Sequence, residues 1–171
     1  MDIMPDFDLI DREYAYDGEL GALYSKAQTT FRVWSPTAQR AVLKLYFSAK
    51  ANLPHSVTEM SRDKGVWEVT VPGDLHGMYY TYEFTFDGST RETIDIYARS
   101  AGANGIRGMV VDLMRTDPAG WGSDRPVTLE SYTDAVIYEL HVRDFSSDKS
   151  ANFRLRGKFG AFCEPQVWQI T

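Results

Sequence analysis

The stretch MYYTYEFTF at residues 78–86, followed at once by Asp87-Gly88, decides the fold of this chain. Its large apolar and aromatic side chains alternate with mostly polar ones, a period of two that is typical of a half-buried antiparallel strand. The face that we expect to be buried carries Met78, Tyr80, Tyr82, Phe84 and Phe86. Because an Asp-Gly pair after such a run is a strong hairpin signal, we expect residues 91–96 to form the returning strand.

Short apolar runs separated by turn residues continue this pattern on both sides. Besides 78–86 and 91–96, the sequence predicts strands at residues 31–34, 41–47, 66–71 and 109–113. In the second of these we expect one buried face, made of Ala41, Leu43, Leu45 and Phe47. No amphipathic helix stands out between residues 28 and 115. This spacing of short strands predicts an all-β, immunoglobulin-like sandwich over residues 28–115.

The rest of the chain has a different character. Residues 1–27 show no period, and we expect an irregular lead there. Residues 116–134 contain Pro118, Gly120, Gly122 and Pro126, and therefore predict a linker.

The run AVIYELHV at residues 135–142 is apolar on both parities except for Glu139 and His141. Such a run favours a strand that is buried on both faces, as in a parallel sheet or an α/β barrel. Left alone, this strand would have open edges. We therefore expect it to pack on the sandwich, to pair with a copy of itself, or to be poorly ordered.

Charge and composition exclude several classes of function. The 171 residues include 18 basic and 24 acidic ones, a net charge of −6, and no basic patch for nucleic acid is visible. This charge is compatible with a neutral ligand such as a sugar. No apolar run reaches 18 residues, so we expect no membrane span. Since the acidic N-terminus does not resemble a secretory signal, we expect a cytoplasmic protein, with secretion behind a removed signal as the alternative.

No residue pattern predicts a metal or a cofactor. His55 and His76 lie in expected turns without metal-ligand spacing, and His141 is expected in the core. The lone Cys163 has no base nearby in sequence and gives no disulfide framework. The glycine-containing loop at residues 102–108 lies between two expected strands. A dinucleotide-binding fingerprint instead needs a strand before the loop and a helix after it, so this loop does not predict phosphate binding.

Two sets of motifs resemble a known family. The first comprises TTFRVWSPTAQRAVLKLYF (29–47), GVWEVTVPGDLHGMYYTYEF (65–84) and ETIDIYARSAGANGIRGMVVDLMRTDPAGW (92–121), and the second is DAVIYELHVRDFS (134–146). Together they resemble the N-terminal region of bacterial type I pullulanases, which are α-glucan debranching enzymes of glycoside hydrolase family 13. The first set is similar to their family 48 carbohydrate-binding module, and the second to the first strand of their (β/α)8 barrel. Isoamylase-type and branching enzymes are the nearest alternatives.

The chain departs from the family pattern in two places. This chain reads Asp95-Ile96-Tyr97 where the family reads Asp-Pro-Tyr, so Ile96 is the departure. After residues 157–159 the family continues with a phrase like LAFTE, whereas this chain reads GAFCEPQVWQIT (160–171). We interpret residues 135–171 as a truncated barrel start with an aberrant tail, and whether this ending is natural stays open.

The resemblance implies a parent enzyme that hydrolyses α-1,6-glucosidic linkages in pullulan, starch or glycogen. Retaining hydrolysis needs two carboxyl groups about 5–5.5 Å apart. The family places its catalytic carboxylates on middle and later barrel strands, which have no counterpart here. Glu139 and Asp144 would lie about 16 Å apart along a strand and make no such pair. We therefore predict no catalytic residue and no activity for this chain alone, with the missing barrel as its partner.

Sugar binding needs exposed aromatic faces with polar groups around them. The candidates are Trp67, Tyr79 and Asn104. The resemblance also argues against strong binding, since glycogen-binding relatives commonly carry a lysine and a tryptophan where this chain has Glu83 and Thr90. We expect weak or absent α-glucan affinity.

Two further aromatic residues, Trp34 and Trp121, are expected to be structural, the second as a linker anchor. Two alternatives to the enzyme-fragment hypothesis stay open. One is a stand-alone α-glucan-binding module, and the other is a structural domain that self-associates through Ala135–Val142.

Overall fold

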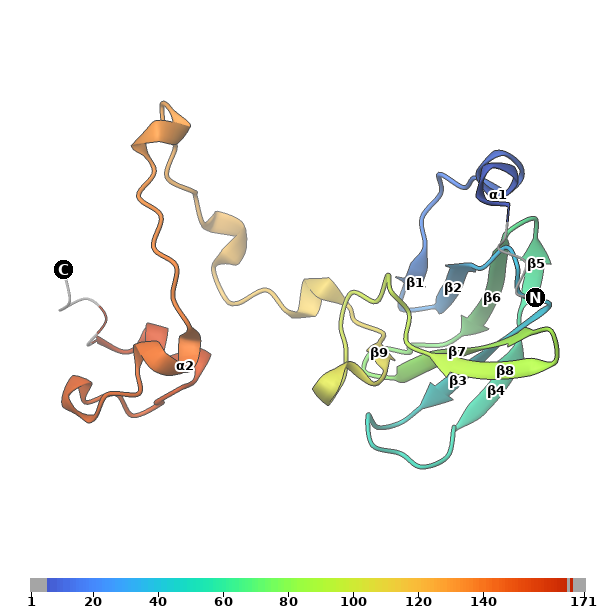
Figure 1. Cartoon of the computed structure of the whole chain (residues 1–171). Helices are drawn as coiled ribbons and strands as arrows, with labels where there is room; N and C mark the ends of the chain where they lie inside the picture. Colours follow the sequence, from blue (N-terminus) through green and yellow to red (C-terminus); the bar gives the residue numbers. More distant parts are fainter. Residues whose placement is uncertain (1–5, 166, 168–171) are drawn as a thin grey trace. The chain divides into compact units, whose positions relative to one another are not determined.

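The computed structural model describes residues 6–165 and 167, and the chain divides into two compact units (Figure 1). Residues 1–121 form the first, here called the sandwich unit, and residues 122–171 form the second, called the C-terminal unit. Each has its own packing.

The sandwich unit holds two antiparallel sheets. A short helix, α1 (Phe7–Tyr14), precedes them. The strands are β1 (Gly21–Tyr24), β2 (Gln28–Trp34), β3 (Arg40–Tyr46), β4 (Ser56–Glu59), β5 (Ser61–Asp63), β6 (Val66–Pro72), β7 (Tyr79–Phe86), β8 (Ser89–Thr93) and β9 (Gly108–Met109). Sheet A has the order β1-β2-β6-β5, and sheet B has the order β4-β3-β7-β8, with β9 also paired to β7. The prediction of an all-β sandwich is confirmed.

Strand β7 lies in the interior of sheet B, between β3 and β8. Its alternating aromatic side chains point from one face of the sheet into the core. Tyr80 and Tyr82 are fully buried, and the Tyr80 ring meets Phe31 of sheet A edge-on with centroids 5.0 Å apart. The hairpin to β8 turns through Asp87 and Gly88, which both have positive φ, as a type I′ turn requires.

Several features differ from the strand predictions. The strands expected at residues 109–113 and 91–96 are β9 (Gly108–Met109) and β8 (Ser89–Thr93), so the first is reduced to two residues and the second begins and ends earlier. Strand β1 and helix α1 lie in the lead that was expected to be irregular, and the polar strands β4 and β5 were not expected. The three strands have too few apolar positions to show a period, and pairing with a neighbouring strand defines them. Helix α1 begins after the N-cap Asp6, whose carboxylate accepts the Leu9 backbone N–H at 3.0 Å. Phe47 is exposed, because β3 ends at Tyr46 and the next side chain lies beyond the sheet.

The C-terminal unit contains short helices and extended chain. The helical turns are α2 (Val142–Phe145) and the 3-10 turns Tyr132–Asp134, Lys149–Ala151 and Phe159–Cys163, and a further one, Trp121–Ser123, lies at the unit boundary. The predicted strand at 135–142 is wrong: residues 135–141 are extended but pair with no strand among the described residues. Val136, Ile137 and Tyr138 are 96%, 89% and 78% exposed. A strand needs partners for its backbone groups, and none is available here.

The chain after α2 packs into a small cluster. The rings of Phe145 and Phe162 stack with centroids 4.6 Å apart, and Phe153 and Ala161 are buried. The Glu164 carboxylate accepts backbone N–H bonds from Arg154 and Leu155 at 2.9 and 2.7 Å. The segment expected to be an aberrant tail is therefore part of this packing as far as Glu164, while residues 166 and 168–171 lie outside the described residues.

Candidate functional site

Trp67, the first predicted sugar contact, is not available to a ligand. It is buried in the core, its Nε1 donates to the Ser35 carbonyl at 3.0 Å, and the Arg62 guanidinium lies over its ring. The turn before β6 and the register with β2 place this ring opposite Val33, between the sheets. The prediction of Trp67 as a stacking platform is therefore wrong.

Tyr79 and Asn104, the other two predicted contacts, are brought to the same part of sheet B. Tyr79 lies on the outer face of β7 and is half-buried. Gly102 packs against it so closely that a Cβ there would lie 3.0 Å from the Tyr79 Cε1. Asn104, two residues further on, is exposed and has a left-handed backbone with φ of 64°. Both remain predicted contacts.

An ion-pair network occupies the outer face of sheet B next to Tyr79. The Lys44 Nζ lies 2.5 Å from a Glu83 oxygen and 2.8 Å from a Glu92 oxygen. The other Glu92 oxygen accepts hydrogen bonds from the Tyr46 and Thr81 hydroxyls at 2.8 and 2.7 Å. Partial burial alone would raise the pKa of Glu92, but the hydrogen bonds from Lys44, Thr81 and Tyr46 outweigh it and hold the pKa at about 2.

Tyr46, a second aromatic side chain on this face, is covered by an arginine. The Arg107 guanidinium lies 3.5 Å from the centroid of the Tyr46 ring. Arg107 also donates to the carbonyl oxygens of Ser48, Ala49 and Ala51 at 2.8 to 3.0 Å. A stacking sugar would have to displace a guanidinium that is held in place by three carbonyl groups.

The two positions where glycogen-binding relatives carry a cation and a tryptophan have other roles here. Glu83 pairs with Lys44, and the Thr90 hydroxyl lies 3.2 Å from that of Thr85 across the hairpin. The outer face of sheet B therefore pairs its charges internally and offers Tyr79 as a half-buried ring. This arrangement favours the predicted weak or absent binding at this face.

The histidines are distributed over separate places. His76 accepts the Asp112 backbone N–H at its Nδ1, 2.9 Å away, and His55 lies against the exposed Phe47 ring. His141 is exposed and its Nδ1 lies 3.4 Å from an Asp144 oxygen, so the expectation of a core position was wrong. Within the described residues, no three His, Cys, Asp or Glu side chains come together as a metal site. Over the same residues, no helix has the length and apolar character that crossing a membrane requires.

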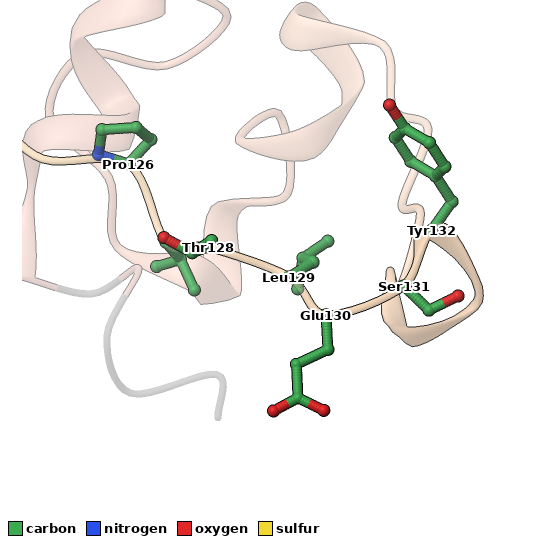
Figure 2. A pocket seen from close by; sticks show the side chains of 7 residues that line it. Pro126, Thr128, Leu129, Glu130, Ser131 and Tyr132 are labelled. Atoms are coloured by element: carbon green, nitrogen blue, oxygen red, sulfur yellow. The ribbon is translucent and has the colours of Figure 1, made fainter.

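A hollow of about 690 Å³ lies in the extended chain of the C-terminal unit (Figure 2). It is lined by residues 126–132, one continuous segment. Figure 2 shows the labelled side chains pointing in different directions from this segment. A binding site needs convergent groups, usually from several elements, so this hollow does not carry a site.

Comparison with known proteins assigns both parts of the chain. The family model for carbohydrate-binding module 48, also described as the isoamylase N-terminal domain, matches residues 19–98. The pullulanase of Bacillus subtilis (strain 168) is 40% identical over 155 residues, which cover 90% of this chain and 21% of that protein. The chain corresponds to the N-terminal region of a type I pullulanase. Chloroplastic pullulanase 1 of Arabidopsis thaliana is 33% identical over 90% of this chain and 17% of its own length.

Solved pullulanase structures agree with the fold. The pullulanase from Bacillus acidopullulyticus superposes with a TM-score of 0.83 at 46% identity, covering 90% of this chain and 19% of that one. A Paenibacillus barengoltzii pullulanase in complex with maltohexaose and α-cyclodextrin gives 0.86 at 42% identity, covering 91% and 24%. The family 48 match runs from just before β1 to just after β8, so the module begins earlier than the predicted residue 28. Asn104 lies beyond the matched range.

Proposed function

We propose that this chain acts as the N-terminal part of an α-glucan debranching enzyme that hydrolyses α-1,6-glucosidic linkages in pullulan, starch or glycogen. The observation that carries the proposal is the 40% identity to a pullulanase over 90% of this chain, which includes both units. The chain spans about a fifth of the length of that relative, and we place the catalytic groups in the remaining part of such an enzyme.

The chain itself takes a non-catalytic role in this proposal. A retaining hydrolase needs one carboxyl group that is protonated at neutral pH beside an ionised one. The Glu164 carboxylate is used structurally, because hydrogen bonds from the backbone N–H groups of Arg154 and Leu155 lower its pKa. Asp148 likewise accepts hydrogen bonds from the hydroxyl and backbone N–H of Ser150, which lower the pKa of Asp148. Such carboxylates stay ionised and do not act as general acids.

The extended segment at residues 135–141 is the contact with the catalytic part. Its apolar side chains are exposed and its backbone edges are open, which suits a strand that joins a sheet formed by the rest of a longer protein. In the absence of that sheet, the same open edges favour self-association through Ala135–Val142. The sandwich unit acts as a structural module with weak or no α-glucan binding on sheet B.

A chimeric enzyme tests this proposal. The matching region of the Bacillus subtilis pullulanase is replaced by this chain, and release of reducing sugar from pullulan is measured. We expect the chimera to be active and the chain alone to be inactive. In the chimera, Ile137→Asp should abolish activity because it places a charge in a buried strand, whereas Leu53→Asp, at an exposed loop position, should not.

Two results would contradict the proposal. One is hydrolysis of pullulan by the isolated chain, which would require catalytic groups within it. The other is a folded chimera that loses no more activity with Ile137→Asp than with Leu53→Asp, which would show that residues 135–141 do not join the catalytic part.

A further inference from the structure

A histidine joins the turn between β6 and β7 to the chain that leaves sheet B. His76 lies in this turn and is half-buried. Its Nδ1 accepts the backbone N–H of Asp112 at 2.9 Å. Asp112 follows β9 and caps the short 3-10 turn Leu113–Arg115. Residues 112–116, here called the exit segment, lead on to residue 121, where the sandwich unit ends. The proposed function makes no use of this contact.

The core holds the turn that carries His76 in place. The Gly77 N–H donates to the Val110 carbonyl at 2.8 Å, and the Val110 N–H donates to the Met78 carbonyl at 2.9 Å. Val110 is fully buried and belongs to the core cluster. Backbone pairing and burial therefore fix the chain as far as Val110, and His76 is placed to hold the residues that follow.

A second contact ties the exit segment to the same turn. The Arg115 Nη2 donates to Asp74 Oδ2 at 3.1 Å, and the Arg115 Nε lies 3.3 Å from an Asp112 carboxylate oxygen. The other Asp74 oxygen accepts the Tyr24 hydroxyl at 2.8 Å and the His76 backbone N–H at 3.1 Å. Hydrogen bonds, that from Tyr24 first, lower the pKa of Asp74. Asp74 and Arg115 therefore keep their charges between about pH 8 and pH 5.

Only the unprotonated His76 ring can make the bond to Asp112. A backbone N–H always donates, so Nδ1 presents its lone pair and the hydrogen of the neutral ring lies on Nε2. A proton taken up from water at Nδ1 would place two N–H groups against each other. Histidine is the side chain that ordinarily takes up a proton between about pH 8 and pH 5. The closed contact therefore binds one proton fewer than the open one, and it weakens as the pH falls.

The charged and titratable groups around His76 come from each element packed against it. Asp74 lies on the same turn, and Asp112 and Arg115 lie on the exit segment. Strand β1 contributes Tyr24, whose ring centroid lies 6.4 Å from that of His76. The two carboxylates favour a proton on the ring and the Arg115 guanidinium opposes it. Both carboxylates already pair with Arg115, and with the ring protonated the Asp112 N–H loses its acceptor.

We propose that His76 is a pH-sensitive clasp, which holds the exit segment on the turn between β6 and β7 when its ring is neutral and releases this segment when its ring is protonated. Release needs no ligand and no reactant except a proton. It makes the chain that leads into the C-terminal unit mobile, while the sandwich core stays folded because burial and backbone pairing hold Val110. The inference goes beyond the proposed function, since neither catalysis nor the joining of residues 135–141 depends on it.

Nuclear magnetic resonance of the full chain tests the clasp at the bond itself. Hydrogen-exchange protection of the Asp112 amide is measured at about pH 7.5 and about pH 5.5, with the intrinsic pH dependence of amide exchange divided out. The neutral form of a histidine side chain in water becomes about tenfold rarer over this range, so we expect protection to fall about tenfold. The heteronuclear NOE of residues 113–116 should fall with it, because a released segment moves freely. Protection of the Val110 amide, which bonds to Met78, should stay unchanged.

Histidine variants separate titration from packing. His76→Asn keeps a hydrogen-bond acceptor that does not titrate, so the Asp112 amide should stay protected at both pH values. His76→Ala removes the acceptor, and protection should be lost at both. His55→Asn is the matched control, because His55 lies against Phe47 at another place in the sandwich unit, and it should keep the wild-type pH dependence. Circular dichroism in the near ultraviolet shows whether each variant is folded, and His76→Asn decides the question if His76→Ala is not.

Three results would overturn the clasp. An Asp112 amide that is unprotected at about pH 7.5, or equally protected at both pH values, would show that no titrating bond holds it. A pH dependence that persists in His76→Asn would assign the titration to another group. Loss of Asp112 protection without a change in the NOE of residues 113–116 would show that the Arg115–Asp74 ion pair holds the segment instead. None of these measurements uses pullulan, so their outcome is independent of the chimera experiment.

Discussion

Two stretches of similar apolar character adopt different states in this chain. Residues 79–86 form β7, with β3 on one edge and β8 and β9 on the other. Residues 135–141, in contrast, are extended without a partner strand among the described residues. Tyr80 and Tyr82 are fully buried, but Tyr138 is 78% exposed. The comparison shows that an apolar run becomes a strand only where other segments satisfy its backbone and cover its side chains.

The largest expected effect separates the two stretches directly. Tyr82→Ala should lower the free energy of unfolding by about 3–5 kcal/mol, because it leaves a cavity in the core where an aromatic ring was buried. Tyr138→Ala should change that free energy by less than about 0.5 kcal/mol, since its ring contacts mainly water. Urea unfolding of both variants measures the difference. Equal effects would show that residues 135–141 are buried in solution.

The buried carboxyl group of the sandwich core gives the second prediction. Burial raises the pKa of Asp95, although hydrogen bonds from the Tyr97 backbone and from Tyr80 and Tyr82 oppose this shift. Since the folded-state pKa is the higher one, the folded state binds more protons, and stability falls as the pH rises from the ordinary carboxyl value of 3.8 through the raised one. Asp95→Asn should remove this pH dependence. The melting temperatures of the wild type and the variant are measured across that pH range. If both change equally with pH, the prediction is contradicted.

Removal of the same carboxyl group should also cost stability. Asp95→Ala leaves the buried Tyr80 hydroxyl without its acceptor and should lower the free energy of unfolding by about 1–3 kcal/mol. Asp124→Ala, at an exposed position in the extended chain, is the control and should have no measurable effect. Chemical denaturation at neutral pH compares the two.

The open backbone edges of residues 135–141 give a prediction about association between copies of the chain. Ile137→Lys should reduce dimer formation by the isolated chain without a change in its free energy of unfolding, because a lysine on an exposed strand edge opposes pairing. Leu53→Lys adds the same charge at an exposed loop position of the sandwich unit and should leave association unchanged. Light scattering after size-exclusion chromatography gives the mass. Dimers that persist in Ile137→Lys would locate the interface elsewhere.

The smallest expected effect concerns the surface network on sheet B. The folded-state pKa of Glu92 is about 2, below its ordinary value of 4.5, so the stability that this network contributes is lost as the pH falls from 4.5 towards 2. The Glu92 side chain is 37% exposed, and the effect should therefore stay below about 1 kcal/mol. Glu92→Gln should remove the fall in the free energy of unfolding between pH 4.5 and 2, while Glu130→Gln should leave it unchanged. A wild-type protein whose free energy of unfolding is constant over this pH range would contradict the prediction.

The sequence by itself determined the class of the fold and its family. The alternation from Met78 to Phe86 and the Asp87-Gly88 turn are local signals, and a period of two needs no information from elsewhere in the chain. The motifs at 29–47, 65–84, 92–121 and 134–146 were sufficient for the resemblance to type I pullulanases. Glu83 and Thr90 already indicated that these two positions of sheet B lack the lysine and the tryptophan that glycogen-binding relatives carry there.

Only the tertiary structure decided which side chains are available to a ligand. Trp67 and Trp34 both stand next to turns, but Trp67 points between the sheets, whereas Trp34 lies at the outer end of β2. The Nδ1 of His76 is occupied by the Asp112 backbone N–H, because β9 pairs with β7 and brings the following segment to the turn between β6 and β7. Strand pairing and burial are non-local, so the exposure of a side chain depends on segments that are far away in the sequence.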